Sequence, residues 1–94
     1  MTFMMKENRV FKQAAGFSFI EVDNGCILYR DADMMAHSLN QTASFVWALC
    51  DGRHTVHEIA DALKTAFDVK GVDVLKVVED IVEAFLRKHL IEQG

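Results

Sequence analysis

The run from Leu39 to Leu63, LNQTASFVWALCDGRHTVHEIADAL, most constrains what this chain can fold into. Apolar residues recur at helical spacing on both sides of a short polar stretch that contains Asp51-Gly52. Asn40 is a typical N-cap for the first helix, and Thr55 with Glu58 forms a capping box for the second. The pattern therefore predicts two short helices joined by a tight turn, as in a helix-turn-helix.

The preceding segment, Phe17–Arg30, has the pattern of a β-hairpin. It is rich in β-prone residues around Asn24-Gly25, the dipeptide that best fits a two-residue type I′ turn. With that turn, Asp23 faces Cys26. One face then carries four residues suited to a core: Ile20, Val22, Ile27 and Tyr29. The other face is more apolar than a solvated face needs to be: Phe17, Phe19, Cys26 and Leu28, with Glu21 and Arg30.

Further elements follow on both sides of the two helices. Residues 34–39 (MMAHSL) predict a third short strand at the edge of the sheet, with unpaired backbone N–H and C=O groups. A turn over residues 68–71 leads to a third helix, from about Val72 to Lys88, that is apolar nearly all round. The predicted fold class is α+β, winged helix-turn-helix-like: a three-stranded antiparallel sheet followed by three helices. Residues 1–14 are expected to be a flexible N-terminal segment, and residues 15–94 the domain.

Composition argues against several classes of function. With 94 residues, 14 acids against 10 bases and a net charge of −4, the chain lacks the basic balance of a nucleic-acid binder. No apolar run is long enough to span a membrane, so neither nucleic acid nor membrane is an expected partner. The two cysteines form no CxxC pair, which favours reduced thiols in a cytoplasm.

Only one cluster suggests a metal or catalytic site. Cys50, His54 and His57 lie close together in CDGRHTVH. A zinc ion normally needs four converging ligands, and Cys50 falls on the apolar stripe of its helix, so the structural interpretation is preferred. We expect no enzyme activity, no metal and no cofactor.

An exposed edge strand beside an apolar helix is an arrangement that binds peptides. A partner segment can add as a further strand through its main chain while alternate side chains enter the apolar groove. Met34 and Met35 fit this use, because methionine adapts to varied apolar partners. The alternative, that the two methionines and the third helix simply meet in the core, is left open by the pattern.

The run from Leu39 onward also resembles the pyrroloquinoline-quinone (PQQ) biosynthesis protein D family. The resemblance covers about residues 16–92, and it departs from the family at His89, where the family tends to have glycine. The positions that carry it are Leu39, Asn40, Thr42, Ala43, Trp47, Leu49, Asp51, Gly52, Thr55, Val56, Glu58, Ile59, Ala60, Phe67, Asp68, Val69, Leu90 and Ile91.

The resemblance implies a non-enzymatic recognition domain. It would bind the leader of a ribosomally made precursor peptide and present it to a radical S-adenosylmethionine (SAM) enzyme or another peptide-modifying enzyme. The leader would lie as an extra strand against the third strand, beside the third helix. Arg30, Arg87 and Lys88 are available for charge pairing with an acidic leader. The expected peptide-binding residues are Met34, Met35, Ala36, His37, Ser38, Val74, Val77, Val78, Ile81, Ala84 and Phe85.

The sequence is also compatible with two other functions and with a homodimer. A winged-helix DNA-binding transcriptional regulator would need a basic surface strip, and four acids lie among the polar positions of the third helix. A structural subunit of a larger enzyme is the lesser alternative. A homodimer through the exposed edge strand is a further possibility, because an unpaired strand invites pairing.

Overall fold

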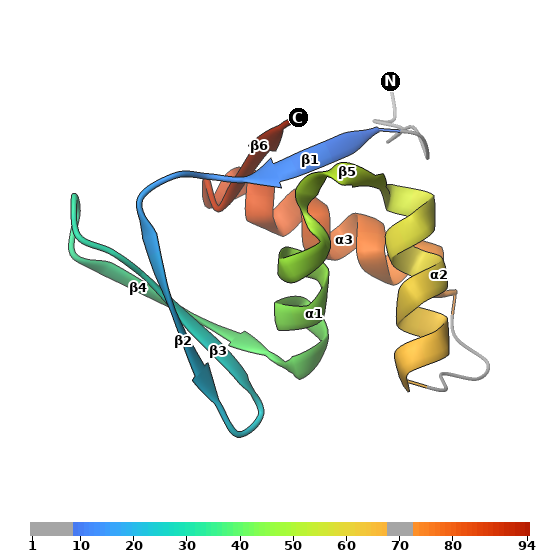
Figure 1. Cartoon of the computed structure of the whole chain (residues 1–94), viewed down its shortest axis with the longest axis horizontal. Helices are drawn as coiled ribbons and strands as arrows, with labels where there is room; N and C mark the ends of the chain where they lie inside the picture. The colour runs from blue at the N-terminus through green and yellow to red at the C-terminus, as the bar shows by residue number, and fades with distance from the viewer. Residues whose placement is uncertain (1–8, 68–72) are drawn as a thin grey trace.

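The computed structural model describes residues 9–67 and 73–94, which form a mixed α+β fold with two three-stranded antiparallel sheets and three helices (Figure 1). No helix in these two ranges is long and apolar enough to cross a membrane. In chain order the elements are β1 (Val10–Gln13), β2 (Phe17–Val22), β3 (Gly25–Arg30), β4 (Met35–Asn40), α1 (Gln41–Leu49), β5 (Asp51–Thr55), α2 (Val56–Phe67), α3 (Val74–Arg87) and β6 (Ile91–Gln93).

The first sheet has the order β2-β3-β4 and contains the predicted hairpin, but its register differs from the prediction. Val22 pairs with Gly25 and Ile20 with Ile27, so the two turn residues are Asp23 and Asn24. Gly25 is already in the strand, at φ +148°, and a Cβ there would overlap the Leu39 carbonyl oxygen. Glycine is therefore needed for close approach to β4 and not for the turn itself.

The core-facing side of this sheet was predicted wrongly. Cys26 and Leu28 are fully buried, whereas Ile20 is 53% and Val22 42% exposed. Alternation groups residues by face but does not say which of two apolar faces meets the helices. The helical side is the one on which Phe19 stacks against Trp47 of α1, with ring centroids 6.0 Å apart.

The second sheet, of order β5-β1-β6, was not predicted. It joins the two ends of the described chain, because Phe11 pairs with Gln93 and Val10 with Thr55. Residues 10–13 of the segment expected to be flexible are therefore a strand, and Phe11 is only 1% exposed. The boundary at residue 15 stays a prediction, and residues 1–8 lie outside the described ranges.

Helices α1 and α2 begin at the positions that the capping pattern predicts. The Asn40 side chain accepts a hydrogen bond from the Ala43 amide at 2.8 Å, and Thr55 and Glu58 form the reciprocal capping box at 3.1 and 2.8 Å. β5 occupies the predicted tight turn between α1 and α2. α3 begins at Val74 after an Asp73 cap, and the predicted turn at residues 68–71 falls outside the described ranges.

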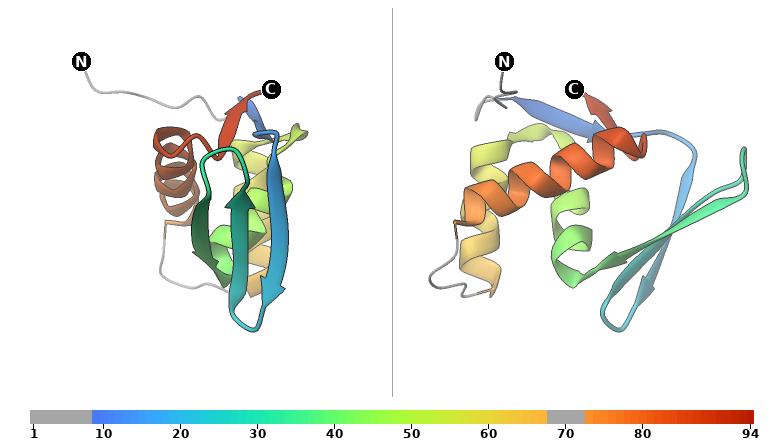
Figure 2. Two further views of the ribbon diagram at one scale, coloured as in Figure 1. Left: turned by 90° about the vertical axis from the view of Figure 1, so that its left-hand side faces the viewer. Right: turned by 180° about the vertical axis from the view of Figure 1, so that it is seen from behind.

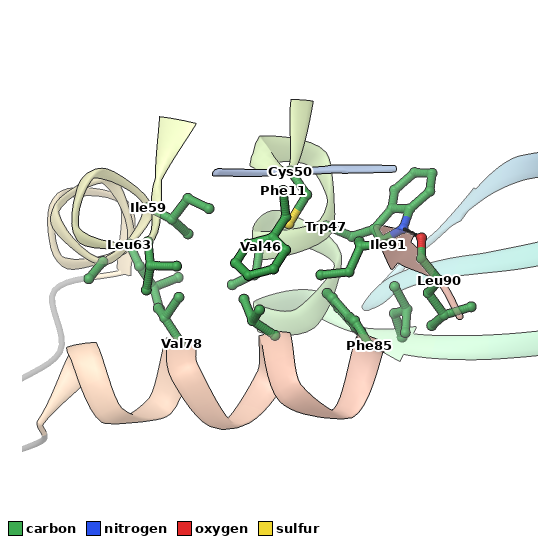
Figure 3. Close-up of a cluster of buried hydrophobic side chains, with 14 of the residues drawn as sticks. Phe11, Val46, Trp47, Cys50, Ile59, Leu63, Val78, Phe85, Leu90 and Ile91 are labelled. Carbon is green, nitrogen blue, oxygen red and sulfur yellow. Dashed lines mark hydrogen bonds between the residues drawn. The ribbon is translucent and has the colours of Figure 1, made fainter. Parts of the chain in front are cut away.

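The three helices enclose one core (Figure 3). Val46 and Trp47 of α1 pack there with Ile59 and Leu63 of α2, and Val78 of α3 joins them. The Trp47 indole N–H donates to the Leu90 carbonyl at 3.1 Å, which ties α1 to the segment after α3. A buried indole N–H needs such a partner, because leaving it unpaired would be costly.

Candidate functional site

The outer edge of β4 faces α3, whereas β2 lies at the opposite edge of the same sheet (Figure 2). Within the described chain β4 pairs with β3 alone, over its full length from Met35 to Asn40. Its other side therefore presents alternating unpaired N–H and C=O groups. Such a row is a template for one more strand, and α3 lies near the last three residues of this edge, Ser38–Asn40.

A groove of about 190 Å³ lies between this edge and α3. We call it the β4 groove, and it is lined by Ser38, Leu39, Asn40, Ala43, Ile81, Ala84, Phe85, Lys88 and Leu90. Six of these nine residues are apolar, and Lys88 is the single charged one. The lining suits an extended segment whose inward side chains are mainly apolar.

One wall of the β4 groove is held by the way α3 ends. The Leu90 amide donates to the Phe85 carbonyl at 2.9 Å and the His89 amide to the Leu86 carbonyl at 3.2 Å, the two bonds of a Schellman motif. His89 takes the left-handed position of this motif, at φ +59°. The motif turns the chain so that Leu90 packs back beside Phe85.

The base of the groove is held by the junction of β4 and α1. Asn40 is the last residue of β4 and also the N-cap of α1, so the strand passes directly into the helix. Ala43 then lies in the first turn of α1 and lines the groove. Leu39, next to the cap, is 8% exposed and joins the core. The groove is thus anchored on three elements that the core holds together.

The structure brings together only part of the predicted peptide-binding set. Ser38 and Ile81 line the β4 groove together with Ala84 and Phe85. The rest of the predicted strand set, Met34, Met35, Ala36 and His37, lies further along β4 and the turn before it. Met34 and Met35 are 76% and 50% exposed, so they do not meet α3 in the core.

The remaining predicted residues of α3 do not line the groove. Val74 and Val78 are buried in the core, and Figure 3 shows Val78 pointing toward the other helices. Val77 is half-buried and is not among the lining residues. The helix is apolar nearly all round because one stripe meets the core and a second, beside it, borders the groove.

Several lining residues were not predicted as contacts: Leu39, Asn40, Ala43, Lys88 and Leu90. Asn40 and Ala43 were interpreted from sequence as helix-starting residues, which they also are. The apolar residue after His89 was the available signal for Leu90, because a Schellman motif places an apolar residue at that position back against the helix.

The cluster of Cys50, His54 and His57 does not converge. The His54 ring nitrogen lies 3.0 Å from the Asp51 carboxylate and the His57 ring nitrogen 3.4 Å from that of Asp61. The bond from His54 lowers the pKa of the Asp51 carboxyl, while burial raises the pKa of the Cys50 thiol to about 12. In residues 9–67 and 73–94 no three His, Cys, Asp or Glu side chains are grouped for a metal.

A second hollow, of about 290 Å³, lies under the β2–β3 hairpin. Its lining includes Phe45 of α1 and Phe67 of α2, whose rings meet edge to face, and the carboxylates Glu21 and Asp23. This hollow is larger than the β4 groove but is bordered by the inner side of the hairpin and by α1. β2 contributes three of its lining residues and α1 four, and none comes from α3.

Comparisons with known proteins bear on the family and the fold of this chain. The sequence matches the family model of Coenzyme PQQ synthesis protein D (PqqD) over residues 25–91. A PqqA binding protein of Methylococcus capsulatus (strain Bath) is 33% identical over 55 residues, which are 58% of this chain and 57% of that relative. The match therefore spans little more than half the length of the curated relative.

Two solved structures share the fold. One is TbiB1 in complex with the TbiA(beta) leader peptide, with a TM-score of 0.73 and 22% identity, covering 86% of this chain and 94% of that chain. The other is the heterocyclase TruD, with a TM-score of 0.67 and 12% identity, covering 92% of this chain and 12% of that chain. At these identities the likeness concerns the fold.

Proposed function

The chain belongs to the Coenzyme PQQ synthesis protein D (PqqD) family, and from this premise we propose that it binds the leader region of a ribosomally made precursor peptide and presents it to a modifying enzyme. The leader adds as a strand along the open edge of β4. Its inward side chains enter the β4 groove against α3, and its main chain completes the hydrogen bonds that β4 leaves open.

The observation that carries this proposal is the coincidence of an open strand edge and an apolar groove at one place. A strand edge alone attracts any extended chain, and a groove alone attracts any apolar ligand. Ser38 and Asn40 of the edge strand line the same groove as Ile81 and Ala84 of α3. One extended peptide therefore satisfies both. Met34 and Met35, at the other end of the edge, offer adaptable contacts to the same peptide.

The relatives support the proposal. One is named for binding PqqA, and one solved structure contains a leader peptide. The same fold also occurs as a small part of a heterocyclase chain, TruD, which supports a role beside a peptide-modifying enzyme. We propose a radical SAM enzyme or another peptide-modifying enzyme as the second partner, and no catalytic role, metal or cofactor for the domain itself.

Two further parts of the proposal concern assembly and location. A homodimer through β4 would compete with the leader for the same edge, so we propose that leader binding and such pairing exclude each other.

We propose the cytoplasm as the location of the protein, because Cys26 and Cys50 are free thiols in the core. Neither thiol is exposed for disulfide formation.

The DNA-binding alternative is less well supported. We also propose that the fold resembles a winged helix-turn-helix. In such a fold α3 would take the place of the DNA-recognition helix. Two of the basic residues on that helix are already paired with acids: Lys76 with Asp80 at 3.3 Å and Arg87 with Glu83 at 3.5 Å. A helix that carries its own neutralising acids has little positive charge left for phosphates.

An amide chemical-shift titration tests the proposal. The probe is a synthetic leader peptide of a precursor encoded beside the gene, and the matched titration uses duplex DNA. We expect saturable shifts along Met35–Asn40 and on the groove side of α3 with the peptide. Saturable shifts on α3 with DNA, and none on β4 with the peptide, would replace the proposal by the regulator alternative.

A further inference from the structure

We propose that Lys88 makes the β4 groove selective for peptides that carry an acidic residue two positions from the apolar residue packed on Ala84. The inference rests on the proposed function and names the chemistry of the bound segment. The occupant is thus an extended peptide with an apolar residue, any residue, and then Asp or Glu, read in either direction along the groove.

Lys88 differs from Arg30 and Arg87, the two other cations that were expected to be available for pairing with an acidic leader. Arg30 lies 3.3 Å from the Asp33 carboxylate and over the Phe17 ring, with its guanidinium carbon 4.6 Å from the ring centroid. Arg87 lies 3.5 Å from the Glu83 carboxylate. Lys88 takes part in no ion pair among residues 9–67 and 73–94, and it is the one of the three that lines the groove.

The lining offers the ammonium of Lys88 no counter-charge. None of the other eight lining residues carries a carboxylate. The Asn40 side-chain oxygen already accepts from the Ala43 amide at 2.8 Å. When a peptide covers the groove, water is displaced from around the ammonium, and an ion pair strengthens as the local dielectric falls. Charge complementarity therefore favours a carboxylate on the peptide.

The spacing follows from the geometry of the two elements. Ala84 and Lys88 are one turn apart on α3, which is about 6 Å along the helix axis. Residues i and i+2 of an extended strand point to the same side and are about 6.6 Å apart. A peptide side chain over Ala84 and its second neighbour over Lys88 therefore match the helix. An acid at the adjacent position would point away from α3.

Lys88 also has an ordinary structural role, since it is the C-cap of α3, where positive charge is favourable. That role affects the stability of the free protein and is independent of any peptide. A test of the inference therefore needs a readout of peptide sequence and not of stability alone.

The experiment selects binders from a displayed library of random peptides against three full-length proteins: wild type, Lys88→Glu and Arg87→Glu. The Arg87→Glu variant is the matched control, because it makes the same change of charge at the neighbouring residue outside the groove. We expect wild type and Arg87→Glu to enrich Asp or Glu two positions from an apolar residue. We expect Lys88→Glu to enrich Lys or Arg there instead.

Synthetic peptides then give the size of the effect. Changing the selected acid to its amide should weaken binding to wild type about tenfold, which corresponds to about 1.4 kcal/mol, and should not weaken binding to Lys88→Glu. Unchanged acid enrichment with Lys88→Glu, or no acid enrichment with wild type, overturns the inference.

A further variant separates this failure from failure of the proposed function. Selected peptides that bind Ala84→Trp as well as wild type do not use the groove, and this result would contradict both. Peptides that lose binding to Ala84→Trp but show no preference for an acid would contradict the role of Lys88 alone. A selection that yields no binder to any of the three proteins counts against both.

Discussion

The two open edges of the first sheet, β4 and β2, have equal length but different surroundings. Each strand has six residues and one neighbour in the sheet. The end of β4, at Ser38–Asn40, lies across a groove of about 190 Å³ from α3, and this groove carries one cation and no carboxylate. α1 borders β2 at the hollow of about 290 Å³ under its hairpin, and this hollow includes the carboxylates of Glu21 and Asp23 but no cation.

The larger hollow is thus not the better peptide site. An extended peptide needs main-chain partners and side-chain pockets at the same time, and the β4 groove combines an open edge with a mainly apolar lining that carries one cation. The β2 side also has a helix beside it, but two acids and no cation line its hollow, and Phe19 there is stacked on Trp47. The comparison teaches that the chemistry of the lining, and not the volume of a hollow, distinguishes a specific peptide site.

The largest expected effect is on the free energy of unfolding, and it compares the wall of the β4 groove with the outer side of β2. Phe85→Ala removes a large side chain that is 3% exposed and lines the β4 groove, and it should lower the free energy of unfolding by about 3–5 kcal/mol. Val22→Ala, on the outer side of β2, should change that free energy by less than about 0.5 kcal/mol. Chemical denaturation measures both. Equal effects would mean that the α3 wall of the β4 groove and the outer side of β2 are equally tied to the core.

The next effect concerns peptide affinity directly. Ala84 and Ala48 are helical alanines that line the β4 groove and the β2-side hollow respectively. Ala84→Trp should fill the groove and weaken a selected peptide by about 2 kcal/mol, or roughly thirtyfold. Ala48→Trp should leave that affinity within about twofold. Titration calorimetry with both variants decides between the sides, and a larger loss with Ala48→Trp would move the site to β2.

A smaller effect tests the support of the groove wall. Trp47→Phe keeps a ring for the stack on Phe19 but removes one of the two donors to the Leu90 carbonyl, which then keeps the Ala14 amide alone. We expect the free energy of unfolding to fall by about 0.5–1.5 kcal/mol. The amide shifts that change most should lie at residues 88–91 on the groove side. Changes confined to β2 would show that the indole serves the stack and not the wall.

The smallest effect is a gain in stability. His89 is held at φ +59° in the Schellman motif, and His89→Gly should raise the free energy of unfolding by about 0.5–1 kcal/mol because glycine takes this conformation without strain. Met34→Gly, at φ +55° in the turn before β4, is the matched variant away from α3. Thermal unfolding measures both, and a loss of stability with His89→Gly would show that its side chain supports the turn.

Features that depend on neighbours in sequence could be predicted from the sequence. Asn40, Thr55 and Glu58 bond within one helical turn, so their side chains alone indicated where α1 and α2 begin. Most of the strands of the first sheet were visible for the same reason, since alternation and turn residues are local. The edge position of β4 followed from the lack of a further strand pattern.

Features that depend on distant partners could not. Val10 pairs with Thr55 and Phe11 with Gln93, so the second sheet has no local pattern longer than a few residues. The hairpin buries the face that carries Cys26 and Leu28, which join the core, and alternation alone could not select that face. Likewise, only the folded chain shows that Lys88 enters the groove while Arg87 pairs with Glu83.

Amide hydrogen exchange at the two edges, with and without a leader peptide, tests the central claim most directly. In the free protein the alternate amides of β4 and β2 that point away from β3 should exchange quickly. With the peptide bound, the account predicts that those of Met35–Asn40 become protected while those of Phe17–Val22 stay fast. Protection along Phe17–Val22 with fast exchange along β4 would contradict it.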